Sequence, residues 1–213
     1  VVRSIHSGNV TGSSGIRGSR GQIGFDGKRV GDSLDEIMEK AGFSKDNKSK
    51  LGGASRQADF DDYCRLKANR DLLISKNAGN EDAKPFMAEY DGMNDELVIA
   101  KHDEFISEYE KAYGNSIIQY QQSMVKFARN NLQYAVDGGL VTQKKANALI
   151  KVCENYVPST RAVEASKSFD YDGVDDITTQ GAMRKREGSD QDFIPLYDAM
   201  ASHDLNIIKK TEV

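Results

Sequence analysis

An apolar register between about Asn94 and Asp137 constrains the fold more than any other feature of the sequence. Its members recur at alternating intervals of four and three residues, with Glu110 and Asn131 as the polar members. Such spacing lines one face of an α-helix and is typical of helices that pack against other helices. Unbroken, this helix would reach roughly 65 Å at 1.5 Å per residue. The apolar row is Ile106, Tyr113, Ile117, Tyr120, Met124, Phe127 and Tyr134.

Glycines mark the weak point and the end of this long helix. Gly114 is expected to bend or weaken it, and Gly138–Gly139 is a strong C-terminal stop. Thr142 then caps a shorter helix, and the tight connection makes the two helices an antiparallel αα-hairpin. The shorter helix ends before Pro158, because a residue that precedes proline avoids the α region. Its apolar face carries Ala146, Leu149, Ile150 and Cys153.

Three further helices are predicted on either side of this hairpin. Ser33 and Glu36 fit a capping box, which starts a short helix that Gly42 closes. A helix from about Asp59 to Ile74 carries one apolar stripe, so we expect it to lie at the surface. Pro195 opens a last helix, since proline suits the first helical turn.

The first 32 residues contain glycine every few positions and are predicted to form a flexible arm or linker. A β-hairpin is indicated inside the arm around the Asp26–Gly27 turn. The phosphate-binding pattern, GxxxxGK followed by Ser or Thr, is missing because Arg29 follows the only Gly–Lys pair. The chain therefore divides into the arm at 1–32, a helical domain at 33–157, and a mostly irregular segment at 158–213 that ends in a helix.

The composition is lean for a compact enzyme. Hydrophobic residues make up 38% of the chain, charged residues 29%, and tryptophan is absent. This balance suits an elongated, mostly α-helical array whose helices complete their burial against other chains. We therefore expect no enzymatic activity and no cofactor.

The charge of the whole chain does not favour binding to a nucleic acid. The net charge is −4, from 29 basic and 33 acidic residues. Two local features leave a weak, nonspecific DNA contact open as an alternative. One is a set of arginines in the glycine-rich arm: Arg3, Arg17, Arg20 and Arg29. The other is a basic cluster that can touch phosphates or form a solvated, partner-docking loop: Arg184, Lys185 and Arg186.

The remaining reactive side chains are interpreted as structural or solvated. His6, His102 and His203 have no second histidine or cysteine at ligand spacing, so each is expected to be solvated and no metal site is predicted. Acidic pairs such as Asp61–Asp62 are expected on solvated faces or at helix N-termini. The two cysteines are expected to be reduced thiols: Cys64 and Cys153.

No stretch approaches the roughly 20 apolar residues that a membrane span requires, and the first residues lack the order of a signal peptide. The sequence starts at Val1 rather than methionine and stops at Val213 soon after a helical pattern. We therefore expect both ends to be cuts, by proteolysis or by excerpting, in a larger polypeptide.

Three phrases between about residues 58 and 200 resemble, in their order and wording, a helical region of the large polyvalent proteins of phages and mobile elements. The first phrase contributes Asp59, Phe60 and Tyr63; the second Gly138, Gly139, Leu140, Tyr156, Val157, Pro158 and Arg161; the third Gly188, Ser189, Pro195 and Leu196. Two departures from the pattern are Ser159–Thr160, in place of an apolar-aromatic pair, and Ile194, in place of aspartate.

The resemblance implies a structural or assembly segment of a larger phage virion protein. Such a protein is internal or of the ejection type, is delivered with the genome, and carries its enzymatic activities in other domains. The expected location is the phage particle, and the host cytoplasm during assembly. No catalytic residue is carried over. A non-catalytic fragment of a multidomain enzyme, such as a nuclease or toxin, and a weak nucleic-acid-binding module remain alternatives.

The expected partners are other virion subunits or other domains of the parent protein, in an oligomeric assembly. The apolar row of the long helix is longer than the helix after Thr142 can cover. We therefore expect part of the row to form a partner interface. Each large side chain buried there contributes roughly 1.5–3 kcal/mol, so several together can hold an assembly.

Overall fold

The computed structural model describes residues 21–43, 47–83, 85, 93–158 and 194–211. In these ranges the chain is mostly α-helical, as the sequence predicts, with one small antiparallel sheet. The elements in chain order are β1 (Gln22–Ile23), β2 (Arg29–Gly31), α3 (Leu34–Lys40), α4 (Arg56–Asn77), α5 (Asp95–Tyr113), α6 (Asn115–Asp137), α7 (Gln143–Val152) and α9 (Leu196–Thr211).

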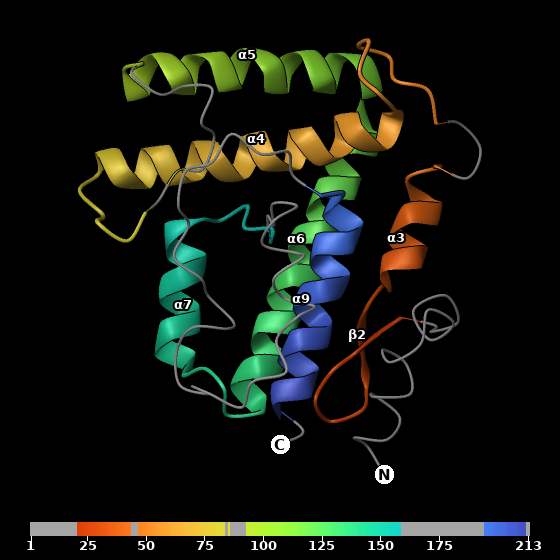
Figure 1. The fold of residues 1–213 in the computed structure, drawn as a ribbon, viewed down its shortest axis with the longest axis vertical. Coiled ribbons are helices and arrows are strands. Elements are labelled where there is room, and N and C mark those ends of the chain that lie inside the picture. The colour runs from red at the N-terminus through yellow and green to blue at the C-terminus, as the bar shows by residue number, and fades with distance from the viewer. Residues whose placement is uncertain (1–20, 44–46, 84, 86–92, 159–193, 212–213) are drawn as a thin grey trace.

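The helices form two layers that cross each other (Figure 1). α4 and α5 lie side by side in one layer, and α6, α7 and α9 run across them in the other. α6 is central to the second layer, because it contacts α7, α9 and α3 as well as both helices of the first layer. None of the helices in the described ranges has the length and apolar character that crossing a bilayer would require.

Four of the helices begin at a side chain that accepts a hydrogen bond from a backbone N–H of the first turn. These caps satisfy donors that have no partner inside the helix. In α3 the capping box is complete, because Glu36 in turn accepts from the Ser33 N–H at 2.9 Å. α6 begins directly after Gly114 and has no side-chain cap. The four capping residues are Ser33, Ser55, Asn94 and Thr142.

The predicted long helix is divided in two at Gly114. Its φ of +59° and ψ of −141° lie outside the helical region and end α5 after Tyr113. α5 then turns across the molecule and packs on α4 (Figure 1). The sequence identified Gly114 as the weak point of the helix but did not predict a complete break. The break is stabilised by contacts between α5 and α4, a helix that lies far from Gly114 in sequence.

The prediction that the helix around Tyr63 lies at the surface is wrong. α4 has α5 on one side and α6 and α7 on the other. Between Asp59 and Leu73 only Asp62 is exposed. Many of the side chains that α4 buries are polar, so its sequence shows only one apolar stripe although more than one face is buried.

The main core forms where α4 crosses α6. Phe60 lies at its centre and meets three aromatic rings edge to face, at centroid distances of 4.9–5.3 Å. Edge-to-face pairs of this kind stabilise a core beyond the area they bury. The three rings come from the loop after α3, the end of α5 and the middle of α6: Phe43, Tyr113 and Tyr120.

The αα-hairpin of α6 and α7 and the last helix follow the predictions. Gly139, at φ +78°, ends α6, and Thr142 caps α7. Ala146 of α7 and Cys153, which caps the C-terminus of α7, are buried, whereas Leu149 and Ile150 are half-buried. α9 follows Pro195 and buries Leu196, Met200, Ile207 and Ile208.

The last twelve residues of the predicted arm are ordered on α6. β1 and β2 pair as the predicted hairpin, with Gly27 at φ +78° in its turn. The Gln22 amide donates to the Phe127 carbonyl at 3.1 Å and also to Asn131. The hairpin therefore packs on the predicted helical domain, and residues 1–20 of the arm lie outside the described residues.

The predicted partner-interface row is mostly the core of the chain itself. Ile106 is partly buried, and the six others are between 0% and 7% exposed. α3, α4 and α9 cover the length that α7 does not reach. The expectation of an uncovered strip fails for these residues, because helices from distant parts of the sequence pack on the row. The six buried residues are Tyr113, Ile117, Tyr120, Met124, Phe127 and Tyr134.

Ile117→Asp or Phe127→Asp should strongly destabilise the fold. Each would place a carboxylate among apolar side chains, and an unpaired buried charge costs several kcal/mol of a total stability of about 5–15 kcal/mol. Lys126→Ala, at an exposed position of the same helix, should change the unfolding free energy by less than about 0.5 kcal/mol. Thermal melts followed by circular dichroism test this; melting temperatures of the Asp variants equal to that of the wild type would contradict it.

Candidate functional site

Asp61 is the centre of a buried polar junction between α4, α6 and α9. One carboxylate oxygen accepts a hydrogen bond from the Tyr120 hydroxyl at 2.9 Å, and the other accepts from the Leu196 N–H at 2.8 Å. Burial raises the pKa of Asp61 to about 6, and the Leu196 N–H, Arg65 and Tyr120 oppose this rise. The junction corrects the expectation that the Asp61–Asp62 pair is solvated, because only Asp62 is exposed.

Arg65 holds the same segment of the chain from one turn further along α4. Its guanidinium donates to the Ile194 carbonyl at 2.6 Å and to Asp62 at 3.2 Å. Asp61 and Arg65 therefore both bind the backbone of residues 194–196, the approach to α9. The Asp61 carboxylate also satisfies a backbone N–H at the N-terminus of α9, where a negative charge is favourable.

Polar pairs fasten α5 to α4 along their whole length. Pairs near the start of α4 join it to the end of α5, and pairs near the end of α4 join it to the start of α5, so the two helices are antiparallel. Successive pairs stand one to two helical turns apart on α4, except those at the adjacent residues Asn69 and Arg70. The pairs are Asp59–Tyr113, Tyr63–Glu110, Asn69–His102, Arg70–Asp103 and Lys76–Asp95. We call this set the α4–α5 ladder.

His102 is the fully buried member of the ladder, which corrects its interpretation as a solvated side chain. Its Nε2 lies 2.9 Å from the Asn69 amide nitrogen, and its side chain is 0% exposed. Burial lowers the pKa of His102 to about 4, and the nearby Asp103 only partly offsets this effect. The ring is therefore neutral at pH 7, with Nε2 as the acceptor of the Asn69 N–H.

Asp59 joins the start of α4 to the end of α5. Both the Tyr113 hydroxyl and the Ser49 hydroxyl donate to the same carboxylate oxygen. Burial, together with the Asp59 carboxylate, raises the pKa of Tyr113. The Tyr113 oxygen in turn accepts the Lys50 N–H at 2.7 Å, so the loop before α4 is held by the same group.

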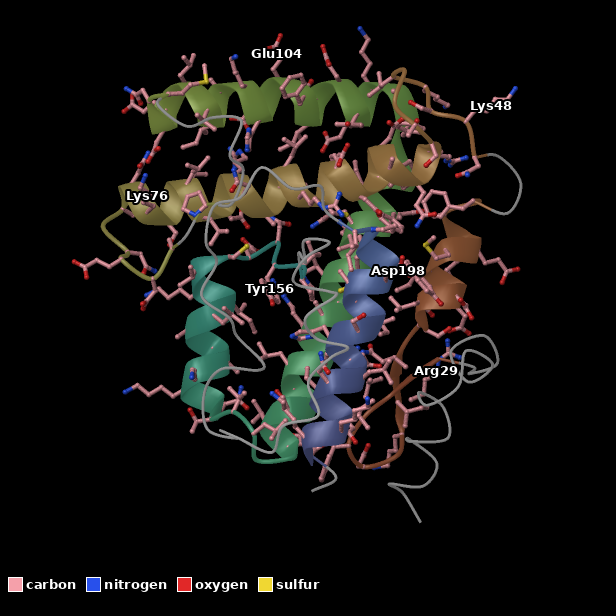
Figure 2. The ribbon with its side chains drawn as sticks, in the orientation of Figure 1. Arg29, Lys48, Lys76, Glu104, Tyr156 and Asp198 are labelled. Atoms are coloured by element: carbon pink, nitrogen blue, oxygen red, sulfur yellow. The ribbon has the colours of Figure 1, made fainter. Side chains whose placement is uncertain are left out.

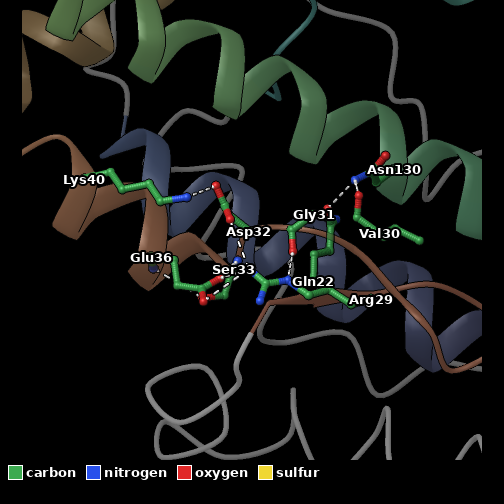
Figure 3. Close-up of polar contacts among 9 residues, drawn as sticks. All are labelled: Gln22, Arg29, Val30, Gly31, Asp32, Ser33, Glu36, Lys40 and Asn130. Atoms are coloured by element: carbon green, nitrogen blue, oxygen red, sulfur yellow. Dashed lines mark hydrogen bonds and ion pairs between the residues drawn. The ribbon is translucent and has the colours of Figure 1, made fainter.

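A shallow groove of about 300 Å³ lies between the β1–β2 hairpin, α3 and α6 (Figure 3). Asn130 donates to the Gln22 amide oxygen at 2.8 Å across it. The Arg29 guanidinium binds Asp32 and Glu36, and Asp32 also binds Lys40. Most of the charge in and around the groove is therefore neutralised by neighbouring side chains.

The other chemistry-bearing residues are spread through the fold. Cys64 and Cys153 are free thiols, as predicted, and both are buried. Burial raises the pKa of the Cys64 thiol well above its ordinary value. Within the described ranges no three His, Cys, Asp or Glu side chains lie close enough to hold a metal ion. The basic cluster Arg184–Arg186 and His6 lie outside the described residues.

The Asp61 junction is closed to solvent. Asp61 is 3% exposed and Tyr120 2%, so a substrate cannot reach the carboxyl–phenol pair. The arrangement therefore fastens helices to one another. Sequence reasoning missed it, because the apolar stripe of α4 indicates only one buried face and a buried carboxylate such as Asp61 looks solvated in sequence. No match to the chain was found among protein-family models, curated proteins or solved structures.

Asp61→Ala should reduce the unfolding free energy at pH 7 by about 1–3 kcal/mol, because it leaves the Leu196 N–H and the Tyr120 hydroxyl without their acceptor. Asp61→Asn keeps one acceptor oxygen and removes the buried charge, so it should be at least as stable as the wild type. Urea unfolding of both variants measures the difference. An Asn variant as unstable as the Ala variant would show that the charge itself holds the junction.

The Asp61 contribution should also depend on pH. Its folded-state pKa of about 6 lies above the ordinary value of 3.8, so the folded protein binds the proton more tightly than the unfolded chain. The resulting stabilisation is complete below pH 4 and is lost as the pH rises through 6. The unfolding free energy of the wild type minus that of Asp61→Asn, measured in urea between pH 4 and 7, should fall as the pH rises, because His102 contributes to both profiles alike; a difference that does not change with pH would contradict the assignment.

His102 should act in the opposite direction. Its folded-state pKa of about 4 lies below the ordinary value of 6.5, so between these values the unfolded chain binds the proton and the folded protein does not. The contribution of His102 to stability should therefore fall by roughly 3 kcal/mol as the pH drops from 6.5 to 4, which urea unfolding measures as the difference between the wild type and His102→Gln. His102→Gln keeps an acceptor for Asn69 and should remove this loss. A ring pKa near 6.5, measured by NMR, would exclude the effect.

Proposed function

We propose that the chain is a structural or assembly segment of a larger phage virion protein, of the internal or ejection type that is delivered with the genome. It acts as a helical building unit, and any chemistry of the parent protein belongs to other domains. The likeness of residues 58–200 to a helical region of polyvalent phage proteins is one support for this proposal. The other support is that polar side chains in the fold join helices to one another.

The observation that carries the proposal is that the buried carboxyl, hydroxyl and imidazole groups are hydrogen-bonded between helices. The Asp61 carboxyl is bound by α6 and α9, and Tyr63 donates to Glu110 at 2.7 Å. His102 meets Asn69 inside the core. These groups have the chemistry of catalytic residues, yet each joins two helices. This use of polar side chains suits a helical building unit.

Those residues of the likeness that lie in the described ranges occupy structural joints as well. Phe60 and Tyr63 lie in the core of α4, and Asp59 joins α4 to α5. Gly138 and Gly139 form the turn between α6 and α7. Further along, Val157 is fully buried and Leu196 is bound by Asp61. A shared architectural unit accounts for a likeness that is concentrated at such positions.

The proposed partners are other virion subunits or other domains of the same polypeptide. The large apolar side chains that remain exposed in the described ranges include Leu97 and Phe105 on α5, at 50% and 41% exposure. Glu104 lies on the side of α5 that faces away from α4 (Figure 2). The outer side of α5 is therefore the proposed contact region, in the particle and in the host cytoplasm during assembly.

Mass spectrometry of particles released by cells that carry the gene tests the proposal. Peptides from residues 93–158 should co-purify with nuclease-treated particles through a density gradient, at a fixed ratio to the main capsid subunit. A known soluble host enzyme serves as the control for contamination. Peptides that are abundant in the cell lysate but absent from the particle fraction would contradict the virion assignment.

Two activity assays separate the alternatives. Metal-dependent cleavage of DNA or RNA by the purified chain, abolished by one carboxylate substitution, would favour an enzyme fragment. Duplex DNA affinity that falls steeply with salt would favour a nucleic-acid-binding module, because phosphate contacts release counterions. The proposed function predicts neither result.

A further inference from the structure

The apolar register of the sequence continues through Gly114, although the helix does not. Tyr113 and Ile117 stand four residues apart on either side of the break and keep the alternation of four and three that runs from Ile106 to Tyr134. Such a pattern is what one continuous helix would present on one face. The sequence and the fold therefore disagree at a single residue.

The start of α6 lacks the features that start the other helices. α3, α4, α5 and α7 each begin at a capping side chain, whereas α6 has none, and no acidic residue lies in its first turn. Ser116, the side chain best placed to help, donates instead to the Tyr113 carbonyl at 2.8 Å. The first turn of α6 therefore has no N-terminal cap, as expected for a segment from the interior of a longer helix.

Gly114 makes the break possible. Its φ of +59° and ψ of −141° are accessible essentially to glycine alone. A Cβ added there would meet no atom within 4 Å, so space does not require glycine at this position. The backbone conformation is what requires glycine at this position. Glycine also adopts the helical conformation, so the same residue permits both a bend and a continuous helix.

The attachment of α5 to α4 combines five polar pairs with a small apolar part. Val98, His102 and Tyr113 are the buried residues of α5, and Ile106, Tyr109 and Ala112 are partly buried against the core. Two rungs of the α4–α5 ladder, Arg70–Asp103 and Lys76–Asp95, lie at the solvent-exposed surface. Groups of this kind regain hydrogen bonds from water when they separate, which lowers the cost of releasing α5.

We propose that the chain has a second conformation, in which α5 leaves α4, Gly114 becomes helical, and residues 95–137 form one straight helix. α5 is roughly 28 Å long at 1.5 Å per residue. A chain as long as the stretch of sequence between Asn77 and Asp95 spans at most about 55 Å at ~3.3 Å per residue, which exceeds the length of α5. The change would uncover the polar side of α4 and turn a packed helix into a projecting rod. This proposal does not depend on the proposed function.

Distances between two spin labels distinguish the two conformations. Glu104→Cys on α5 and Gln133→Cys on α6 are exposed positions, and both native cysteines are buried. In a straight helix the labelled backbone positions stand about 44 Å apart at ~1.5 Å per residue. In the structure α5 runs across the direction of α6 instead of continuing it (Figure 1), so the labelled positions stand closer together than in a straight helix.

Gly114→Ala should shift the labelled protein toward the long distance. A residue other than glycine is disfavoured in the bent backbone but favoured in a helix, so the ratio of long to short distances should rise at least about fivefold. Gly139→Ala is the matched control, because Gly139 also has a positive φ and open space around its Cβ, yet ends α6. The control should keep the short distance.

The double variant Arg70→Ala/Lys76→Ala provides a second, independent test. It removes the two exposed rungs from the α4 side and leaves α5 and the core unchanged, so the protein should fold and populate the long distance more than the wild type. Circular dichroism reports folding in each case. A single short distance in every folded variant would overturn the proposal, and if Gly114→Ala does not fold, the double variant decides alone.

Discussion

The whole fold depends on the pairing of the buried polar side chains of α4. This helix lies between two layers, and between Asp59 and Leu73 it exposes only Asp62. Burying a polar or charged group without a partner costs several kcal/mol, so a helix of this composition can lie at the centre only if each group is met. On one side of α4, side chains of α5 pair with its polar groups through the α4–α5 ladder. On the other side, Asp61 accepts hydrogen bonds from α6 and α9.

This pairing also explains how a lean chain specifies one packing arrangement. Apolar residues make up only 38% of the sequence, and apolar contacts alone permit many similar arrangements. Buried hydrogen bonds accept few alternatives, because a shift by one turn would leave donors and acceptors unmatched. The same pairing has a pH consequence: Asp61 and His102 titrate in overlapping windows with opposite effects on stability, so their contributions partly cancel between about pH 4 and 6.

Local signals in the sequence predicted local structure correctly. The Ser33 capping box, the Gly138–Gly139 stop, the Thr142 cap and the hairpin at Gly27 all involve residues close together in the chain. Features that depend on distant residues were missed. Asp61 was expected in solvent because its partners lie far along the chain, and α4 was placed at the surface because its buried polar side chains look solvated in sequence. The prediction that the apolar row forms a partner interface was wrong for a related reason. The pattern shows that the row is buried but not whether another chain or another helix of the same chain buries it.

Native-state hydrogen exchange tests the central position of α4 most directly. If paired polar groups bury this helix between two layers, its amides between Phe60 and Leu73 should be among the slowest in the chain and should exchange only through global unfolding. The amides of α5, which few buried side chains hold, should exchange faster through local opening. Amides of α4 that exchange as fast as those of α5, at free energies well below global unfolding, would contradict this account of the fold.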